Sequence, residues 1–202
     1  VSFAAQAGAA DGTLVLPLAA EADLATRGAA LSDAERAAIG RAIASAEFSY
    51  GARATLSLRG IGEWERILLI GLGEDADALD YQNAGAVTGR ALISESGPVT
   101  VLTHGLSAEA ASEFALGMGI GEYRSDLYDT DDRDPMGPTT IVSDAADAAQ
   151  TYARRGRAIV EAMAFTRDLS NEPANVIYPE AFVQRTRAAF AGIPGVSIRV
   201  LD

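Results

Sequence analysis

The sequence of 202 residues contains no cysteine and no lysine, and its only histidine is His104. The absence of cysteine excludes disulfides, thiolate metal sites and a cysteine nucleophile. A single histidine excludes metal motifs built on histidine pairs and argues against a histidine-based catalytic triad. The side chains that most often carry metal and nucleophilic chemistry are therefore almost missing.

Long hydrophobic runs are missing as well. The longest unbroken apolar stretch, Ile67–Ile70, is far shorter than the ~20 residues that span a bilayer. The apolar segment Leu14–Ala20 follows no positive charge and so does not indicate a secretory signal. The chain begins at Val1, which indicates a trimmed or tagged start. We expect a soluble cytoplasmic protein that does not bind a membrane.

Positive charge is scarce, since 16 arginines face 28 acidic residues and the formal net charge is −12. An acidic surface repels phosphate backbones, which disfavours nucleic acid and anionic membranes as partners. Hydrophobic residues make up 49% of the chain, enough for a sizeable core. The length suits one domain, or one domain plus a piece of another.

Strand-like and helix-like segments alternate along most of the chain. Helix starts are indicated at Ser32, with Glu35 three residues later, and at Ser107. The predicted strands are 13–18, 54–58, 66–73, 99–102 and 139–142; the predicted helices are 34–46, 77–94, 108–123 and 144–169, and 126–138 is predicted to be a loop. This alternation predicts a layered α/β sheet.

The last 30 residues have a different pattern. Pro173 must end the long helix, and Pro179 suits the first turn of a new one. Val196–Val200 then alternates apolar and polar residues and predicts a strand. A helix followed by one strand normally continues into a further crossover, so we interpret this unit as the opening of a second domain that has been cut off. The alternative is that the strand pairs at the edge of the first sheet.

One weak ligand-binding pattern follows the apolar strand. Gly71 and Gly73 lie between a predicted strand and a predicted helix, and Ala76 takes the place of a third glycine in a dinucleotide fingerprint. Acidic residues at 74, 75 and 77 would face any pyrophosphate. A tight turn after a buried strand is the favoured interpretation.

Two charged clusters are candidates for other sites. The five aspartates between 126 and 134 do not match a calcium loop, because the positions that require glycine and a final carboxylate hold Asp134 and Thr140. Arg154, Arg155 and Arg157 could form a partner-binding patch. For both clusters a solvated surface is favoured, with the arginines paired to Asp144, Asp147 or Glu161. His104 follows a predicted strand, and we interpret it as a loop residue.

The segment from Thr166 to Glu180 carries the strongest signal. It reads Arg-Asp-Leu-Ser-Asn-Glu-Pro-Ala-Asn from position 167 and reaches a proline four residues later. It resembles the junction of leucyl (cytosol) aminopeptidases, peptidase family M17, where an Arg-Asp-Leu-x-Asn-x-Pro-x-Asn-x-x-x-Pro pattern ends a linker helix and opens the catalytic domain. The residues at the matched positions are Arg167, Asp168, Asn171, Pro173, Asn175 and Pro179.

Two upstream segments resemble the same family more weakly. Glu122–Thr130 is similar to a family stretch of Tyr-Arg-Phe-Asp-x-Tyr-Lys-Thr type, but it departs from it at Ser125 and Asp129. Ile67–Gly73 is similar to the family's glycine-ended apolar strand. The resemblance covers nearly the whole chain and is strong from about residue 158 onward.

The resemblance implies a three-layer α/β/α, macro-domain-like mixed sheet over residues 1–145. It further implies a linker helix over 146–170 and, over 171–202, the first segment of a truncated metallopeptidase catalytic domain. Family enzymes bind two divalent metals (Mn or Zn) through Lys, Asp and Glu, use a metal-bridged water as nucleophile, and are commonly cytoplasmic hexamers. The chain contains neither a lysine nor the family's Asn-Thr-Asp-Ala-Glu-Gly-Arg motif. No residue therefore receives a catalytic or metal-binding role.

The sequence thus predicts the non-catalytic amino-terminal portion of a leucyl-aminopeptidase-like metallopeptidase. Its expected role is scaffolding, with its own catalytic domain and sister subunits as partners. The alternative is a free-standing macro-like module that binds a nucleotide or ADP-ribose near Gly71 and Gly73. DNA binding, known for some members of the family, is disfavoured by the charge of −12.

Overall fold

A computed structural model describes residues 1–125, 127–128, 130 and 134–201. Its centre is a mixed six-stranded sheet in the order β1-β6-β5-β2-β4-β3, in which every neighbouring pair is parallel except β3 and β4. The strands are β1 (Ser2–Ala4), β2 (Thr13–Leu18), β3 (Thr55–Leu58), β4 (Arg66–Gly71), β5 (Val99–Leu102) and β6 (Thr139–Val142). The predicted strands from 13 to 142 are confirmed, and β1 was not foreseen.

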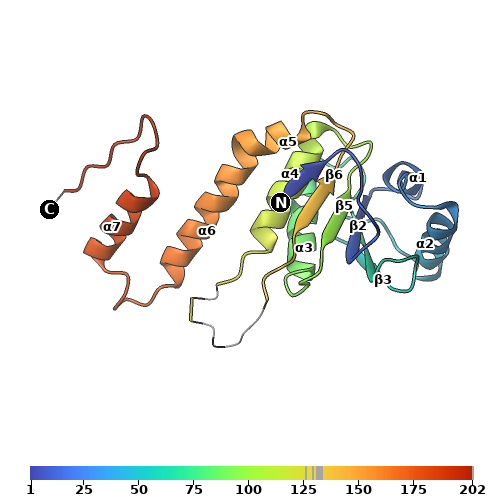
Figure 1. Cartoon of the computed structure of the whole chain (residues 1–202), viewed down its shortest axis with the longest axis horizontal. Coiled ribbons are helices and arrows are strands. Elements are labelled where there is room, and N and C mark those ends of the chain that lie inside the picture. Colours follow the sequence, from blue (N-terminus) through green and yellow to red (C-terminus); the bar gives the residue numbers. More distant parts are fainter. Residues whose placement is uncertain (126, 129, 131–133, 202) are drawn as a thin grey trace.

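Helices cover both faces of the sheet and extend beyond it (Figure 1). They are α1 (Asp23–Arg27), α2 (Asp33–Ser45), α3 (Ala78–Ala91), α4 (Ala108–Gly121), α5 (Ala148–Thr151), the π-turn η1 (Tyr152–Gly156), α6 (Arg157–Asn171) and α7 (Pro179–Ala189). α1 and α2 lie on one face, and α3 and α4 on the other. The predicted α/β layering is confirmed, whereas a macro-like topology stays a prediction.

The central strands β2 and β4 are buried on both faces, as the apolar run at 67–70 predicts. Alternate side chains along these strands belong to two separate hydrophobic cores. Val15, Leu68 and Ile70 pack with α3 and α4, and Leu14 and Leu69 pack toward α1 and α2. The sheet is therefore the middle of three layers.

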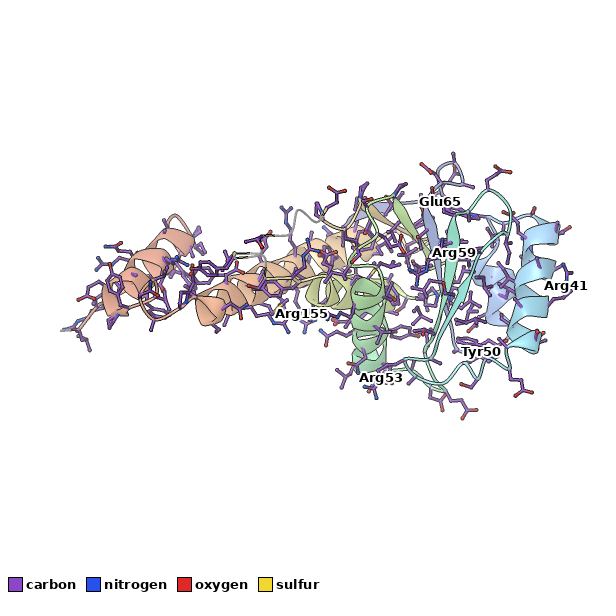
Figure 2. All side chains as sticks on the ribbon, turned by 90° about the horizontal axis from the view of Figure 1, so that it is seen from below. Arg41, Tyr50, Arg53, Arg59, Glu65 and Arg155 are labelled. Carbon is purple, nitrogen blue, oxygen red and sulfur yellow. The ribbon has the colours of Figure 1, made fainter. Side chains whose placement is uncertain are left out.

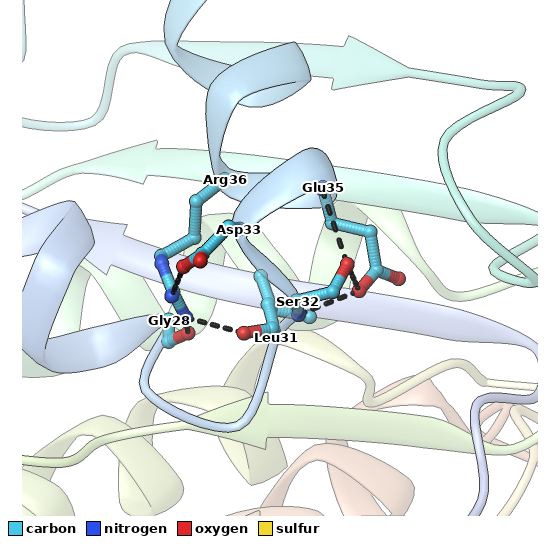
Figure 3. Close-up of polar contacts among 6 residues, drawn as sticks. All are labelled: Gly28, Leu31, Ser32, Asp33, Glu35 and Arg36. Carbon is cyan, nitrogen blue, oxygen red and sulfur yellow. Dashed lines mark hydrogen bonds and ion pairs between the residues drawn. The ribbon is translucent and has the colours of Figure 1, made fainter.

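The start of α2 shows how local sequence fixes these elements (Figure 3). The Ser32 backbone N–H donates to Glu35 Oε2 at 2.8 Å, and the Glu35 N–H donates to Ser32 Oγ at 3.3 Å. Hydrogen bonds from the Ser32 hydroxyl and backbone lower the pKa of Glu35. Arg36 donates to the carbonyl of Gly28 at 2.9 Å and pairs with Asp33. The predicted capping box is confirmed.

α3 and α4 approach each other so closely that their backbones touch. A Cβ placed on Gly117 would lie 1.9 Å from the Gln82 carbonyl oxygen, and one on Gly85 would lie 2.0 Å from that of Phe114. Glycine is therefore required at this crossing because any side chain would separate the helices. The two helices form a tightly packed layer against the sheet.

The prediction of a strand at Val196–Val200 is wrong. These residues form no regular structure, and all five are exposed. Alternating polarity makes a strand only when a neighbouring strand supplies hydrogen bonds, and none lies beside this segment within the described part of the chain. The predicted long helix is confirmed in outline, but it begins at Ala148 and contains a π-turn.

Among the helices that the structure describes, none combines the length and the apolar composition needed to cross a membrane.

Candidate functional site

Three residues of the junction pattern meet at Tyr123, just beyond the end of α4. The Tyr123 hydroxyl donates to Asp168 Oδ1 at 2.7 Å and accepts from Asn171 Nδ2 at 3.1 Å. The Arg167 guanidinium lies over the ring, 5.1 Å from its centroid. A cation over an aromatic face and two hydrogen bonds to one hydroxyl make a directional attachment. We call Tyr123, Arg167, Asp168 and Asn171 the Tyr123 cluster.

The electrostatics of the cluster keep the tyrosine neutral. Burial of the ring, together with its hydrogen bond to the Asp168 carboxylate, raises the pKa of Tyr123. An ionised phenolate would lose its donated hydrogen bond and stand beside a carboxylate of the same charge. The cluster is therefore assembled around a protonated tyrosine at neutral pH.

A second contact lies one residue beyond the cluster. The Glu172 carboxylate binds Arg185 of α7 at 2.6 Å and accepts a hydrogen bond from the Tyr128 hydroxyl. Its side chain is only 4% exposed, and the hydrogen bonds from Tyr128 and then Arg185 lower its pKa. Glu172 thus ties α7 to the chain that follows α4.

The prolines of the pattern shape the connection between α6 and α7. The Pro173 carbonyl accepts from the backbone N–H groups of Val176 at 2.8 Å and Ile177 at 3.0 Å, which closes a turn. Pro179 stands in the first turn of α7, as predicted. Asn175 is exposed, and its side chain makes no hydrogen bond within the described residues. The structure thus brings Arg167, Asp168 and Asn171 together, whereas Pro173 and Pro179 lie in the turn and at the start of α7.

The surface beyond the cluster is unusually apolar. Eight of the twelve exposed large hydrophobic side chains among the described residues lie in the last 25 positions. They are Tyr178, Phe182, Phe190, Ile193, Val196, Ile198, Val200 and Leu201. Grouped exposure of this kind is typical of interaction surfaces, because the surfaces of soluble monomers rarely gather so many apolar groups.

The glycine turn after β4 offers little to a phosphate. Its three backbone N–H groups are all occupied, since Gly71 donates to Ala54 O, Leu72 to Leu18 O and Gly73 to Tyr50 O at 2.7–2.9 Å. A Cβ on Gly71 would lie 2.1 Å from a carbonyl oxygen of the loop before β3, which carries Tyr50 and Arg53 (Figure 2). Gly71 thus serves close backbone packing, and Gly73, with φ of +83°, serves the turn.

A cavity of about 510 Å³ does lie beside Gly73. It is lined by Tyr50 and by the exposed carboxylates of Glu21 and Glu74. Two negative charges at its rim disfavour an anionic ligand. The glycine pair thus lies next to a cavity, but the cavity has the wrong charge for a pyrophosphate.

The structure describes the arginine cluster and only part of the aspartate cluster. Arg155 pairs with Glu113 and Arg157 with Glu161, the latter at 2.9 Å and as predicted (Figure 2 labels Arg155). The described residues contain no group of three His, Asp or Glu side chains that could hold a metal ion. Most of the aspartate cluster, at 126, 129, 131 and 132, lies outside the described residues.

His104 lies in the loop after β5, as interpreted from the sequence. Its carbonyl oxygen accepts a hydrogen bond from the buried side chain of Arg27, which also donates to the Pro17 carbonyl at 3.1 Å. Burial lowers the pKa of Arg27, whereas the charge of Asp23 raises it. The contact joins α1 to β2 and to the loop after β5, and it involves only the backbone carbonyl of His104.

The roles of Tyr123, Tyr128 and Arg185 were not foreseen from the sequence. Tyr123 and Asp168 are 45 residues apart, so no local pattern links them. The available signal was indirect, because Tyr123 and Tyr128 belong to the second segment that resembles the aminopeptidases. Two separate family-like segments are therefore in contact with each other in space.

Comparisons with known proteins identify the family of the chain. The family model described as "Cytosol aminopeptidase family, N-terminal domain" matches residues 15–132. A probable cytosol aminopeptidase of Methylorubrum extorquens is 34% identical over 194 residues, covering 89% of this chain and 38% of the relative. One of Dinoroseobacter shibae is 32% identical and covers 96% of this chain and 37% of the relative. The chain thus spans well under half the length of these relatives.

Solved structures show the same fold. A mutant of tomato leucine aminopeptidase aligns with a TM-score of 0.72 and 20% identity, covering 94% of this chain and 42% of the other. The bottromycin maturation enzyme BotP, in complex with Mn, aligns with a TM-score of 0.63 and 24% identity over 88% of this chain and 36% of the other. On the family match and the curated relatives together, the chain belongs to the cytosol aminopeptidase family and contains its N-terminal domain.

Proposed function

We propose that the chain is the non-catalytic amino-terminal portion of a leucyl-aminopeptidase-like metallopeptidase. In the whole enzyme, a catalytic segment would remove amino-terminal residues from peptides by two-metal hydrolysis, and residues 1–202 would hold and orient it. The observation that carries the proposal is the Tyr123 cluster, which fixes the junction pattern by contacts suited to attachment rather than to chemistry. The exposed apolar side chains beyond it supply a surface for the catalytic segment.

The pattern of burial supports a division of the chain into three segments. We assign 1–145 to the sheet domain, 146–170 to the linker helix and 171–202 to the first segment of the catalytic domain. Buried side chains are frequent from Thr13 to Ser143, and beyond 145 they continue with Ala148 and Tyr152. In α6 and α7, all of whose residues the structure describes, no residue is buried. A segment without a buried side chain gains little stability on its own, which supports its assignment to another core.

The residues of this chain do not fit the two divalent metals, Mn or Zn, of the proposed enzyme. The described part holds no suitable group of donors, and the whole sequence lacks cysteine and lysine. BotP, which shares the fold, is described in complex with Mn. We therefore assign metal binding to other parts of the enzyme and no catalytic step to residues 1–202.

The proposed partners are the catalytic segment and sister subunits in a homo-oligomer, a hexamer in the family, and the proposed location is the cytoplasm. The naming of the curated relatives as cytosol aminopeptidases supports the location. The apolar surface from Tyr178 to Leu201 supports an extensive protein contact.

A chimera tests the proposal. Residues 1–202 are joined to the part of the Methylorubrum extorquens relative that follows its aligned region, and leucine p-nitroanilide hydrolysis is measured with added Mn²⁺. We expect turnover by the chimera and none by residues 1–202 alone. The matched variants are Tyr123→Ala, expected to reduce assembly and turnover, and Arg41→Ala on the far side of the sheet, expected to change neither (Figure 2). Hydrolysis by the isolated 202-residue chain would disprove a non-catalytic role.

The alternative function, a nucleotide or ADP-ribose module at Gly71 and Gly73, has less support because the backbone N–H groups of residues 71–73 are all hydrogen-bonded and two glutamates line the nearby cavity. Calorimetric titration of the chain with ADP-ribose is expected to show no heat of binding. Saturable heat that disappears in Gly73→Ala would restore this function.

A further inference from the structure

The π-turn η1 lies between α5 and α6, where a continuous helix was predicted. The Arg157 backbone N–H donates to the Tyr152 carbonyl, five residues back, instead of the usual four. A Cβ on Gly156 would lie 2.5 Å from Cδ2 of Tyr152, so the ring packs directly on the glycine. The Tyr152 ring also contacts Phe3, with centroids 5.6 Å apart. The turn is therefore held by packing against the sheet domain.

The residues that face the core across this turn are spaced by four. Ala148 and Tyr152 are 2% and 9% exposed, Gly156 is buried, and Val160 packs against the core from α6. In an unbroken α-helix, which turns about 100° per residue, Ala148 and Val160 would point about 120° apart. A π-turn absorbs one extra residue and reduces this difference to about 20°. Val160 therefore reaches Gly119 of α4, where an added Cβ would lie 2.7 Å from it.

The change in helical phase at the π-turn also determines the direction in which the junction residues point. Arg167 and Asn171 follow Val160 by 7 and 11 residues and so lie within about 20° of its direction, and Asp168 lies within about 80°. These three side chains make the Tyr123 cluster. If the same residues formed an unbroken α-helix, these side chains would be turned about 100° away from Tyr123.

We propose that η1 is a one-residue phase adjustment that positions Arg167, Asp168 and Asn171 on Tyr123 and so sets the direction of the chain beyond Asn171. Tyr152 and Gly156 are the positioning residues, since their packing holds the extra residue in place. The inference goes beyond the proposed function, because it concerns the orientation of α6 whatever that helix carries.

Deletion of Arg154 tests the phase directly, because it removes the residue that the turn absorbs, so that an unbroken α-helix should carry the junction in its original phase. Its side chain is exposed and makes no hydrogen bond or ion pair within the described part of the chain, so Arg154→Ala is the matched control. The readout is a double-mutant cycle with Tyr123→Phe and Asn171→Ala, measured by urea unfolding of the 202-residue chain. We expect about fivefold coupling in the unfolding constant for the parent and for Arg154→Ala. The same coupling is expected in the deletion, because the junction keeps its phase, and its loss in a folded deletion chain would contradict the proposal.

A second pair of chains keeps the test decisive if the deletion does not fold. One alanine inserted between Glu161 and Ala162 rotates the junction by about 100° on its own and should abolish the coupling. Combined with the Arg154 deletion, it gives a chain of the original length whose junction is still rotated by about 100°, so the coupling should stay absent. Coupling that persists in the phase-shifted chains overturns the proposal. None of these measurements depends on peptidase activity, so the outcome is independent of the proposed function.

Discussion

The sheet domain and the C-terminal segment differ both in charge and in burial. Residues 1–145 carry nine arginines against 22 acidic residues, a net charge of −13, and contain two cores. Residues 146–202 carry seven arginines against six acidic residues, a net charge of +1. In this segment α6 and α7 extend away from the sheet without a buried residue. Helix α7 therefore depends on local signals and on Glu172, whereas α3 and α4 depend on packing.

The difference teaches that secondary structure and stability have separate origins in this chain. Pro179 and the amphipathic pattern suffice to specify α7, but they bury nothing. Conversely, α4 is apolar nearly all round and is fixed by its neighbours. Substitutions of the same kind should therefore have very different effects in the two regions.

The largest contrast is expected between two phenylalanines. Phe114→Ala removes a ring that is 0% exposed and should lower the free energy of unfolding by about 3–5 kcal/mol. Phe182→Ala, at 49% exposure, should change it by less than about 0.5 kcal/mol. Urea denaturation of both variants measures this. Similar losses would mean that α7 belongs to the main cooperative unit.

A pair of helix glycines gives the next largest effect. Gly117→Ala places a methyl group 1.9 Å from the Gln82 carbonyl oxygen and should cost about 1–3 kcal/mol as α3 and α4 separate. Gly40→Ala, in α2 with nothing within 4 Å, should stabilise by up to about 1 kcal/mol. Thermal unfolding should therefore shift in opposite directions. A shared sign would show that the close helix crossing does not limit stability.

The smallest effect concerns pH and the boundary between the two regions. Because the folded-state pKa of Tyr123 is raised, its contribution to stability is full below about pH 10 and is lost as pH rises through the folded-state value. Tyr123→Phe should therefore lose less stability than the parent between pH 9 and pH 11. Urea unfolding at both pH values is the measurement. An identical loss would place the alkaline sensitivity on the other tyrosines.

Local signals made much of the sheet domain predictable. The buried run of β4 and the capping residues Ser32 and Ser107 act within a few positions, and each is found as predicted. Strand β1, of three residues, and helix α1, of five, were missed because such short segments show no hydrophobic periodicity. The strand expected at Val196–Val200 failed for the opposite reason, since its pattern is clear but its partner is missing within the described residues.

The candidate site was predictable only in part. Arg167, Asp168 and Asn171 stood out by resemblance, but their target Tyr123 could not be derived, because the contact spans more than 40 residues. The π-turn was hidden as well. Its sequence reads as an ordinary helix, and only the spacing of residues that pack on α4 and the sheet domain shows the extra residue.

Because Val160 packs on Gly119, α6 tilts about this contact, and a small tilt there is magnified at Asn171. About 16 Å of helix separates Val160 from Asn171, so a tilt of about 10° at the contact with Gly119 would move Asn171 by about 3 Å. That displacement exceeds the tolerance of the hydrogen bond to Tyr123, which is already 3.1 Å long. The hydrogen bond between Asn171 and Tyr123 is therefore sensitive to the tilt of α6, and it breaks at a tilt that leaves the contact between Val160 and Gly119 intact.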